Sequence, residues 1–204
     1  EDNKVSISSD SSIVDNEDDV KDIVSDELVL RSYGHQGTSL DPLDIAVNSL
    51  NSVNFEDITG GIYLNQTGDL EITLILSQGS VDIHVAGEVT VSSNMIADFG
   101  TLDLYGETGV IQTAGRIDGE YGTVIGSGGD IETSSGTQVL SDGSVVIGSL
   151  DTDSVIIRGE VTALDDVEIY AGLNIELGTI EAGDDATLTA VSGYIRDIDP
   201  VVPD

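Results

Sequence analysis

Apolar and polar residues alternate in short segments that recur through the second half of the chain, from Gly79 to Arg196. Alternation with a period of two predicts β-strands that bury one face and expose the other. A fixed return of about 19 to 22 residues between such segments is the sequence signature of a solenoid. The segments begin at Gly79, Gly100, Gly122, Gly143, Asp165 and Asp184.

Superimposing the six segments on these starting residues predicts two inward-facing columns. The first column contains Val81, Leu102, Val124, Val145, Val167 and Ala186. The second contains Ile83, Leu104, Gly126, Ile147, Ile169 and Leu188. The mostly polar residues between them, expected to face outward, are Asp82, Asp103, Ile125, Val146, Glu168 and Thr187.

Strands repeated at this spacing can stack as parallel rungs about 4.8 Å apart, with the rest of each coil supplying the crossover. The predicted fold class is therefore all-β, a right-handed parallel β-helix (β-solenoid) with coils of about 19–22 residues. Four segments are expected: an acidic N-terminal coil over 1–25 that continues from a preceding repeat, irregular coils over 26–78, regular coils over 79–198, and a proline-containing connector over 199–204. Within 26–78, the pattern predicts strands at 44–50, 60–65 and 69–74 and a loop at 34–43. We expect almost no helix.

The two ends of the chain look alike. Residues 4–8 repeat the short alternation of residues 185–189, and residues 13–15 match residues 195–197. One interpretation is a unit of a longer tandem array that begins and ends on equivalent coils. Chance similarity between two strands of small residues is the alternative. The chain starts without a Met or a leader-like segment, so we expect a processed protein or a piece of a larger one.

Charge narrows the possible partners. The chain has 6 Lys+Arg against 39 Asp+Glu, a formal net charge of -33. Like charge disfavours nucleic acid and anionic membrane surfaces, and no apolar run is long enough to span a membrane. The absence of cysteine excludes a disulfide framework and thiolate metal sites. A saline or extracellular setting, with the protein secreted or at the cell surface, fits this composition.

Paired acidic residues at successive turns are the candidate metal ligands. Asp165 and Asp166 occupy the same place in their coil as Asp184 and Asp185 do in the next, so the pairs are expected about 5 Å apart. Carboxylates at such a short separation can share a hard cation. Oxygen ligands of this kind suit Ca²⁺, which is therefore the candidate cofactor. A solvated acidic edge is the other interpretation, because Asp is common in turns in any case.

Little in the sequence points to catalysis. The few basic residues are not set beside a carboxylate cluster in a distinctive motif, although Arg158-Gly159-Glu160 comes nearest. His84 is expected on the outward side of its strand, and His35 lies in a glycine-rich loop without a nucleophile motif. Tyr105 and Tyr170 are expected to share an outward column that could contact carbohydrate or a partner. We therefore expect no catalytic residues and no enzyme.

Several coils resemble the repeats of giant bacterial surface proteins of the filamentous-haemagglutinin type. The resemblance is carried by DIVSDELVLRS, GTSLDPLDIAVNSL and GGIYLNQTGDLEITL, and by the later GSVDIHVAGEVTV and DDATLTAVSGYIRD. It covers roughly residues 3–198 and implies a secreted β-helical stalk or adhesin. The chain departs from such repeats in its acidic balance and at His35-Gln36, where an apolar pair is expected.

Two functions follow as expectations. The first is a structural repeat unit of an extracellular β-helical fibre, stalk or adhesin, assembling head-to-tail with identical or similar units. The second is a Ca²⁺-dependent β-helix module that binds a glycan or a protein partner at the cell surface.

Overall fold

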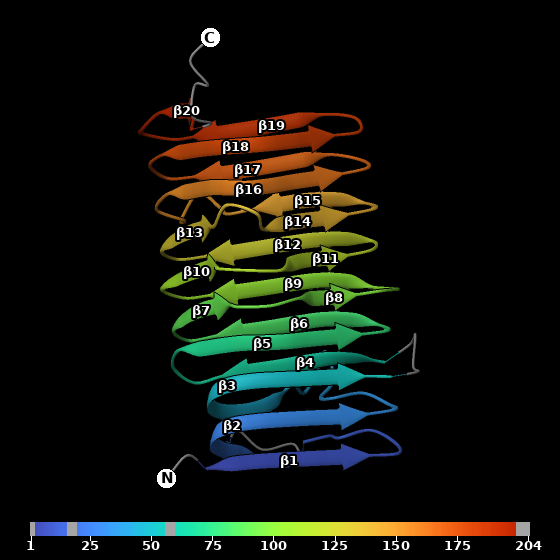
Figure 1. The fold of residues 1–204 in the computed structure, drawn as a ribbon. Coiled ribbons are helices and arrows are strands. Elements are labelled where there is room, and N and C mark those ends of the chain that lie inside the picture. The colour runs from blue at the N-terminus through green and yellow to red at the C-terminus, as the bar shows by residue number, and fades with distance from the viewer. Residues whose placement is uncertain (1–2, 16–19, 56–59, 199–204) are drawn as a thin grey trace.

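The computed structural model describes residues 3–15, 20–55 and 60–198. Within them the chain forms strands and no helix, and the strand pairings are parallel throughout. The strands make a β-solenoid of about nine turns with ~21 residues per turn, and Figure 1 shows the turns stacked along one axis with the two termini at opposite ends. The predicted all-β parallel solenoid is therefore confirmed.

The strands are β1 (Lys4–Ser9), β2 (Ile23–Ser32), β3 (Leu43–Asn54), β4 (Gly61–Gln66), β5 (Leu70–Ser77), β6 (Ser80–Val85), β7 (Glu88–Val91), β8 (Met95–Ala97), β9 (Thr101–Gly106), β10 (Gly109–Gln112), β11 (Arg116–Gly119), β12 (Gly122–Ser127), β13 (Asp130–Thr133), β14 (Gln138–Ser141), β15 (Ser144–Ile147), β16 (Val155–Ala163), β17 (Val167–Ala171), β18 (Ile175–Ala182), β19 (Ala186–Ala190) and β20 (Ile195–Asp197). The segment at 44–50, which alternation predicts as a strand, lies in β3.

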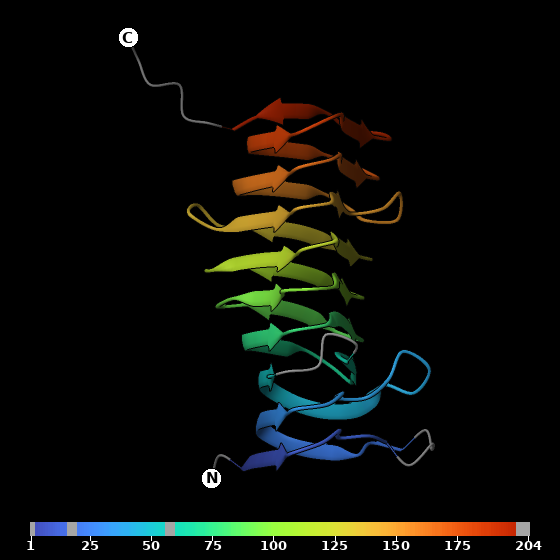
Figure 2. The same cartoon turned by 90° about the vertical axis from the view of Figure 1, so that its right-hand side faces the viewer.

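Two walls of stacked strands enclose the core. The first wall consists of β4, β6, β9, β12, β15, β17 and β19. In the second wall, each turn contributes either one long strand or two short ones, so that β16 pairs with both β13 and β14. β1, β2 and the end of β3 extend the second wall toward the N-terminus. Figure 2 shows the same stack from the side, with loops projecting from it.

One core column of the first wall runs through the whole solenoid. Its members are Ile13, Gln36, Ile62, Val81, Leu102, Thr123, Val145, Val167 and Ala186. Partners in this column are between 19 residues apart, as for Ile62 and Val81, and 26 apart, as for Gln36 and Ile62. The residue two positions on in each strand forms the second predicted column, in which Ile83, Leu104, Ile147 and Ile169 are fully buried. The positions of the first column are apolar except for Gln36 and Thr123, and their stacking keeps the core continuous from rung to rung.

The turn that begins at Gly122 departs from the predicted alignment by one residue. Gly122 pairs with Thr101 and Ser144, not with the glycines at 100 and 143. Thr123 and Ile125 therefore face the core, being 0% and 1% exposed, while Val124 is 38% exposed. The prediction that Val124 and Gly126 face inward, and Ile125 outward, is wrong.

A polar residue fits the core at this point because its hydroxyl is fully used. The Oγ1 atom of Thr123 accepts a hydrogen bond from the Gly119 N–H at 2.9 Å and donates one to the Leu140 carbonyl at 2.7 Å. A buried hydroxyl without such partners would destabilise the fold. The glycine that starts the segment in sequence is thus a weaker guide to register than the hydrogen bonds that Thr123 can make.

Gln36 is a second buried polar residue whose side chain is hydrogen-bonded. It lies near the N-terminus, where the sequence suggests an apolar pair. It lies between Ile13 and Ile62 in the first-wall column and is fully buried. Its Nε2 atom donates to Ser32 Oγ at 3.2 Å and to the Val53 carbonyl at 3.0 Å, and its Oε1 atom accepts from the Ser52 hydroxyl. The side-chain amide therefore links the two walls across the interior.

The predicted equivalence of the two chain ends is wrong in register. Val5 belongs to a second-wall column that continues through Leu28 and Leu50 and reaches Leu177 and Asp197. Ala186, which the sequence matches with the same strand, lies in the first wall. Residues 199–204, predicted to form a connector, lie outside the described residues, as do 16–19 of the acidic N-terminal coil.

Candidate functional site

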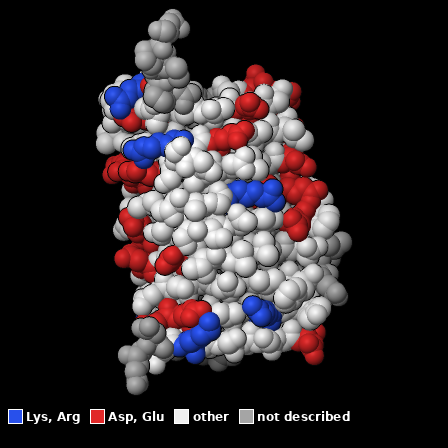
Figure 3. Space-filling view, in the orientation of Figure 1, with Lys and Arg blue, Asp and Glu red and all other residues white. Residues whose placement is uncertain are grey.

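The most prominent charged feature is an acidic corner where the second wall turns into the first. We define the acidic corner as Asp98, Glu120, Asp142, Asp165 and Asp184, which lie in the turns before β9, β12, β15, β17 and β19. In the view of Figure 3, acidic side chains gather toward the lateral margins of the molecule and leave a largely uncharged band between them. The carboxylates of the acidic corner thus lie where the chain turns from one wall to the other.

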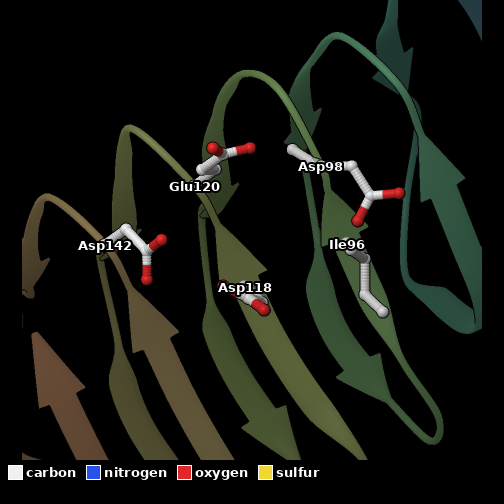
Figure 4. Close-up of a pocket in the computed structure, with 6 residues that line it drawn as sticks. Ile96, Asp98, Asp118, Glu120 and Asp142 are labelled. Carbon is white, nitrogen blue, oxygen red and sulfur yellow. The ribbon is translucent and has the colours of Figure 1, made fainter.

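A shallow hollow lies along this corner. It has a volume of about 180 Å³ and is lined by Ile96, Ala97, Asp98, Asp118, Glu120 and Asp142. Figure 4 shows that the labelled acidic residues come from successive turns. The alignment by segment starts identified only part of this grouping: Asp165 and Asp184 are themselves segment starts, and Asp98, Glu120 and Asp142 stand one or two positions before a start.

Asp118 is a half-buried carboxyl of the hollow, with its side chain 22% exposed. Burial raises the pKa of Asp118, and the neighbouring Asp142 and Asp98 charges raise it further. The Arg116 guanidinium, whose Nη2 atom is 3.3 Å from Asp118 Oδ2, lowers this pKa in part. Because one cation serves several carboxylates here, the hollow favours positively charged species.

The four predicted metal ligands lie on adjacent rungs, as the sequence suggests. The Asp184 N–H donates to the Asp165 carbonyl at 3.0 Å, and the Asp185 N–H donates to Asp166 Oδ1 at the same distance. One carboxylate oxygen of Asp166 is therefore used by the backbone of the next turn. Among the described residues, no group of three or more His, Cys, Asp or Glu side chains is placed to hold a metal ion. Ca²⁺ binding at these residues stays a prediction.

The Asp166 contact belongs to a recurring type. Asp69 Oδ1 accepts a hydrogen bond from the Glu88 N–H at 2.9 Å, and Asp130 Oδ1 accepts one from the Ser154 N–H at 2.9 Å. In each case a carboxylate satisfies a backbone donor one turn further along the solenoid, where the ladder of strand hydrogen bonds is interrupted. Part of the acidic composition is therefore explained by the backbone of the turns.

A second group of titratable residues lies on the outer face of the first wall. Asp82 and Asp103 are stacked partners on β6 and β9. Burial raises the pKa of both carboxyls, Asp82 raises that of Asp103 further, and His84 opposes the shift in each. His84 faces outward as predicted, and its ring packs edge-on against Tyr105 with the ring centroids 5.0 Å apart.

The predicted outward column of tyrosines is also present. Tyr105 stacks on Gly126. The aligned core residues Ile125, Ile147 and Ile169 place Tyr170 in the same column, three rungs beyond Tyr105. The Tyr105 ring lies over Gly126, so that a Cβ atom there would be 2.8 Å from the ring. The Tyr170 hydroxyl donates to Glu168 Oε2 at 2.7 Å. Both rings are thus held by their neighbours on the sheet.

The fold and this surface define the chain as a parallel β-solenoid with an acidic corner. Comparison with protein families, with curated proteins and with solved structures finds no match. The resemblance to filamentous-haemagglutinin-type repeats therefore stays a prediction beyond the shared solenoid fold. The described residues contain no helix that is long and apolar enough to cross a membrane.

Proposed function

We propose that this chain is a structural segment of an extracellular β-helical fibre, stalk or adhesin, with length and stiffness as its contribution. The observation that carries the proposal is the uninterrupted core column from Ile13 to Ala186. About nine turns at about 4.8 Å give a rod of roughly 43 Å. Each turn is held by its neighbours along the axis, which suits a role in spanning distance.

The ends of the rod support assembly with further coils. Val5, Ile7 and Ile13 at one end are partly buried against the core, and so are Leu188 and Ala190 at the other. An open rung also presents backbone N–H and C=O groups that another strand can pair with. These features support head-to-tail continuation into similar solenoid units, in the same chain or another. A net charge of -33 favours solubility at a saline cell surface.

Duplicating whole turns tests the structural proposal. Residues 101–143 form two turns, because Thr101 pairs with Gly122 and Gly122 pairs with Ser144. A second copy inserted after residue 143 keeps every later strand in register. We expect a folded protein of unchanged or higher melting temperature, whose maximum dimension in X-ray scattering grows by about 10 Å.

The matched control duplicates residues 101–132, which ends part of the way round a turn. It adds a similar composition but places first-wall strands over the second wall. We expect this variant to melt at lower temperature and to lose the linear increase in length. Equal behaviour of the two insertions, or unfolding of the whole-turn insertion, would contradict the proposed rod.

The acidic corner favours one alternative, a Ca²⁺-dependent module that binds a glycan or a protein partner. Its carboxylates lie on successive turns along one edge, and the outward rings of Tyr105 and Tyr170 offer surfaces for a sugar face. Melting with and without Ca²⁺ separates this alternative from the rod.

A further inference from the structure

One outward column of the second wall carries a cation at each of its two ends. It begins with Lys4 on β1 and ends with Arg196 on β20. Between them lie Glu27, Ser49, Glu71, Thr90, Ile111, Glu132, Ile156 and Glu176. Among the described residues, Lys4, Arg116, Arg158 and Arg196 form ion pairs with a carboxylate, and the pairs of Lys4 and Arg196 are at the ends of this column.

Each end cation bridges to the carboxylate one rung inward. Lys4 Nζ lies 2.5 Å from Glu27 Oε1, and Arg196 Nη2 lies 2.6 Å from Glu176 Oε1. The two cationic side chains remain 53% and 58% exposed, so each is open to a group that approaches from beyond the end. At both ends, therefore, the cation lies on the terminal rung and the carboxylate lies on the next rung along the axis.

A second copy of the chain does not match this surface. Continuing both core columns across the contact places Lys4 of one copy over Arg196 of the other. Like charges directly opposite one another on paired strands destabilise the pairing. The neighbouring core column ends in Asp197, over which the second copy would place Val5. An apolar side chain stacked on this carboxylate would remove it from water, which costs free energy.

The residues further along the same two columns indicate which side chains fit next to the terminal residues. Lys4 is followed inward by Glu27, and Arg196 by Glu176, so a carboxylate is the neighbour that each cation accepts. The column that ends in Asp197 contains Gln112 and Thr133, both buried, so it accommodates hydrogen-bond donors. A strand that pairs with β20 should therefore carry an acidic residue followed by Ser, Thr or Gln.

We propose that the end faces select a solenoid coil different from their own, one that presents a carboxylate opposite Arg196 and a hydrogen-bond donor opposite Asp197. At the other end, the fitting coil presents a carboxylate opposite Lys4. This inference rests on the proposed structural function, and it specifies the neighbour within it. Like charges disfavour a contact between two identical copies, and opposite charges favour the contact with the different coil.

Recoding β1 to match β20 tests the inference. The recoded chain carries Lys4→Glu with Glu27→Lys, which preserves an ion pair inside the unit, and Val5→Thr, which supplies the donor. We expect the wild type to sediment as a monomer and the recoded chain to form head-to-tail oligomers at a concentration at least about tenfold lower, a difference of about 1.4 kcal/mol in association. Added NaCl should weaken this association.

Two controls separate charge from other effects. Val5→Thr alone keeps Lys4 over Arg196 and should stay monomeric. The recoded chain with Arg196→Glu and Glu176→Arg again places like charges together and should return to monomer. Thermal melting of every variant verifies that the unit remains folded.

Two results would overturn the inference. A wild type that associates as strongly as the recoded chain would show that identical copies fit, which agrees with the proposed rod but not with selection. A recoded chain that remains folded and monomeric would show that these residues do not govern the end contact. The rod itself is judged separately by the turn-duplication experiment.

Discussion

Val124 and Ile125 are adjacent in β12 and face opposite sides of the first wall. Their side chains are 38% and 1% exposed. We predict that Ile125→Asn lowers the free energy of unfolding by about 3 kcal/mol, because it removes a packed side chain and buries an unpaired amide. Val124→Asn should change the same quantity by less than about 0.5 kcal/mol. Urea unfolding measures both, and equal losses would contradict the register.

Residues also show where the sequence stops being informative. The columns through Val81, Leu102, Val145 and Val167 follow from alternation, because a period of two fixes which face is buried. The turn at Gly122 does not, because its starting glycine suggests one register and its apolar residues are compatible with two. The deciding contacts are the hydrogen bonds of Thr123 to Gly119 and Leu140, which depend on the neighbouring turn. No pattern within a single segment contains that information.

Among the elements, the short last strand β20 is held by one carboxylate. Glu176 Oε1 on β18 accepts hydrogen bonds from the Tyr194 hydroxyl and from Arg196 Nη2, each at 2.6 Å. These bonds lower the pKa of Glu176 below its ordinary value of 4.5. A lowered pKa in the folded state means that the contribution to stability is present above pH 4.5 and is lost as the pH falls through the lowered value.

We predict that Glu176→Gln loosens β20 while leaving the rest of the solenoid in place. Amide hydrogen exchange over 195–197 should accelerate several-fold at neutral pH, and the difference from wild type should shrink in acid as Glu176 becomes protonated. Glu181→Gln, at an exposed position of the same strand β18, is the matched control and should leave exchange in β20 unchanged. Unaltered exchange in the Glu176 variant would show that pairing with β18 alone holds the last strand.

The elements also explain why the chain ends were matched wrongly from sequence. Strands of both walls alternate in the same way, because each has one face in the core. Alternation therefore identifies a strand but not the wall to which it belongs. Val5 lies in the second wall and Ala186 in the first, which only the pairing of complete turns reveals. Part of the acidic corner, Asp165 and Asp184, could be found from sequence, because these two residues start segments that the alignment places in the correct register.

For the whole molecule, repulsion between carboxylates acts against the compact rod. The net charge of -33 comes from carboxylates in the turns, as in the acidic corner, and on outer strand faces, as at Asp82 and Asp103. Screening shortens the range of this repulsion from about 30 Å at 0.01 M salt to about 8 Å at 0.15 M. We predict that the melting temperature rises as NaCl is added, and a fall would contradict this electrostatic account.

Melting in CaCl₂ and in NaCl at equal ionic strength completes the test. If the carboxylates act only through screening, as the structural proposal expects, the two salts raise the melting temperature equally. A cation that binds the folded state specifically adds a further increase that grows with its concentration. An excess in CaCl₂ that EDTA reverses, and that Asp165→Asn with Asp184→Asn removes, would favour the Ca²⁺-dependent module over the plain rod. Asp69→Asn, away from the acidic corner, is the control that should retain any such excess.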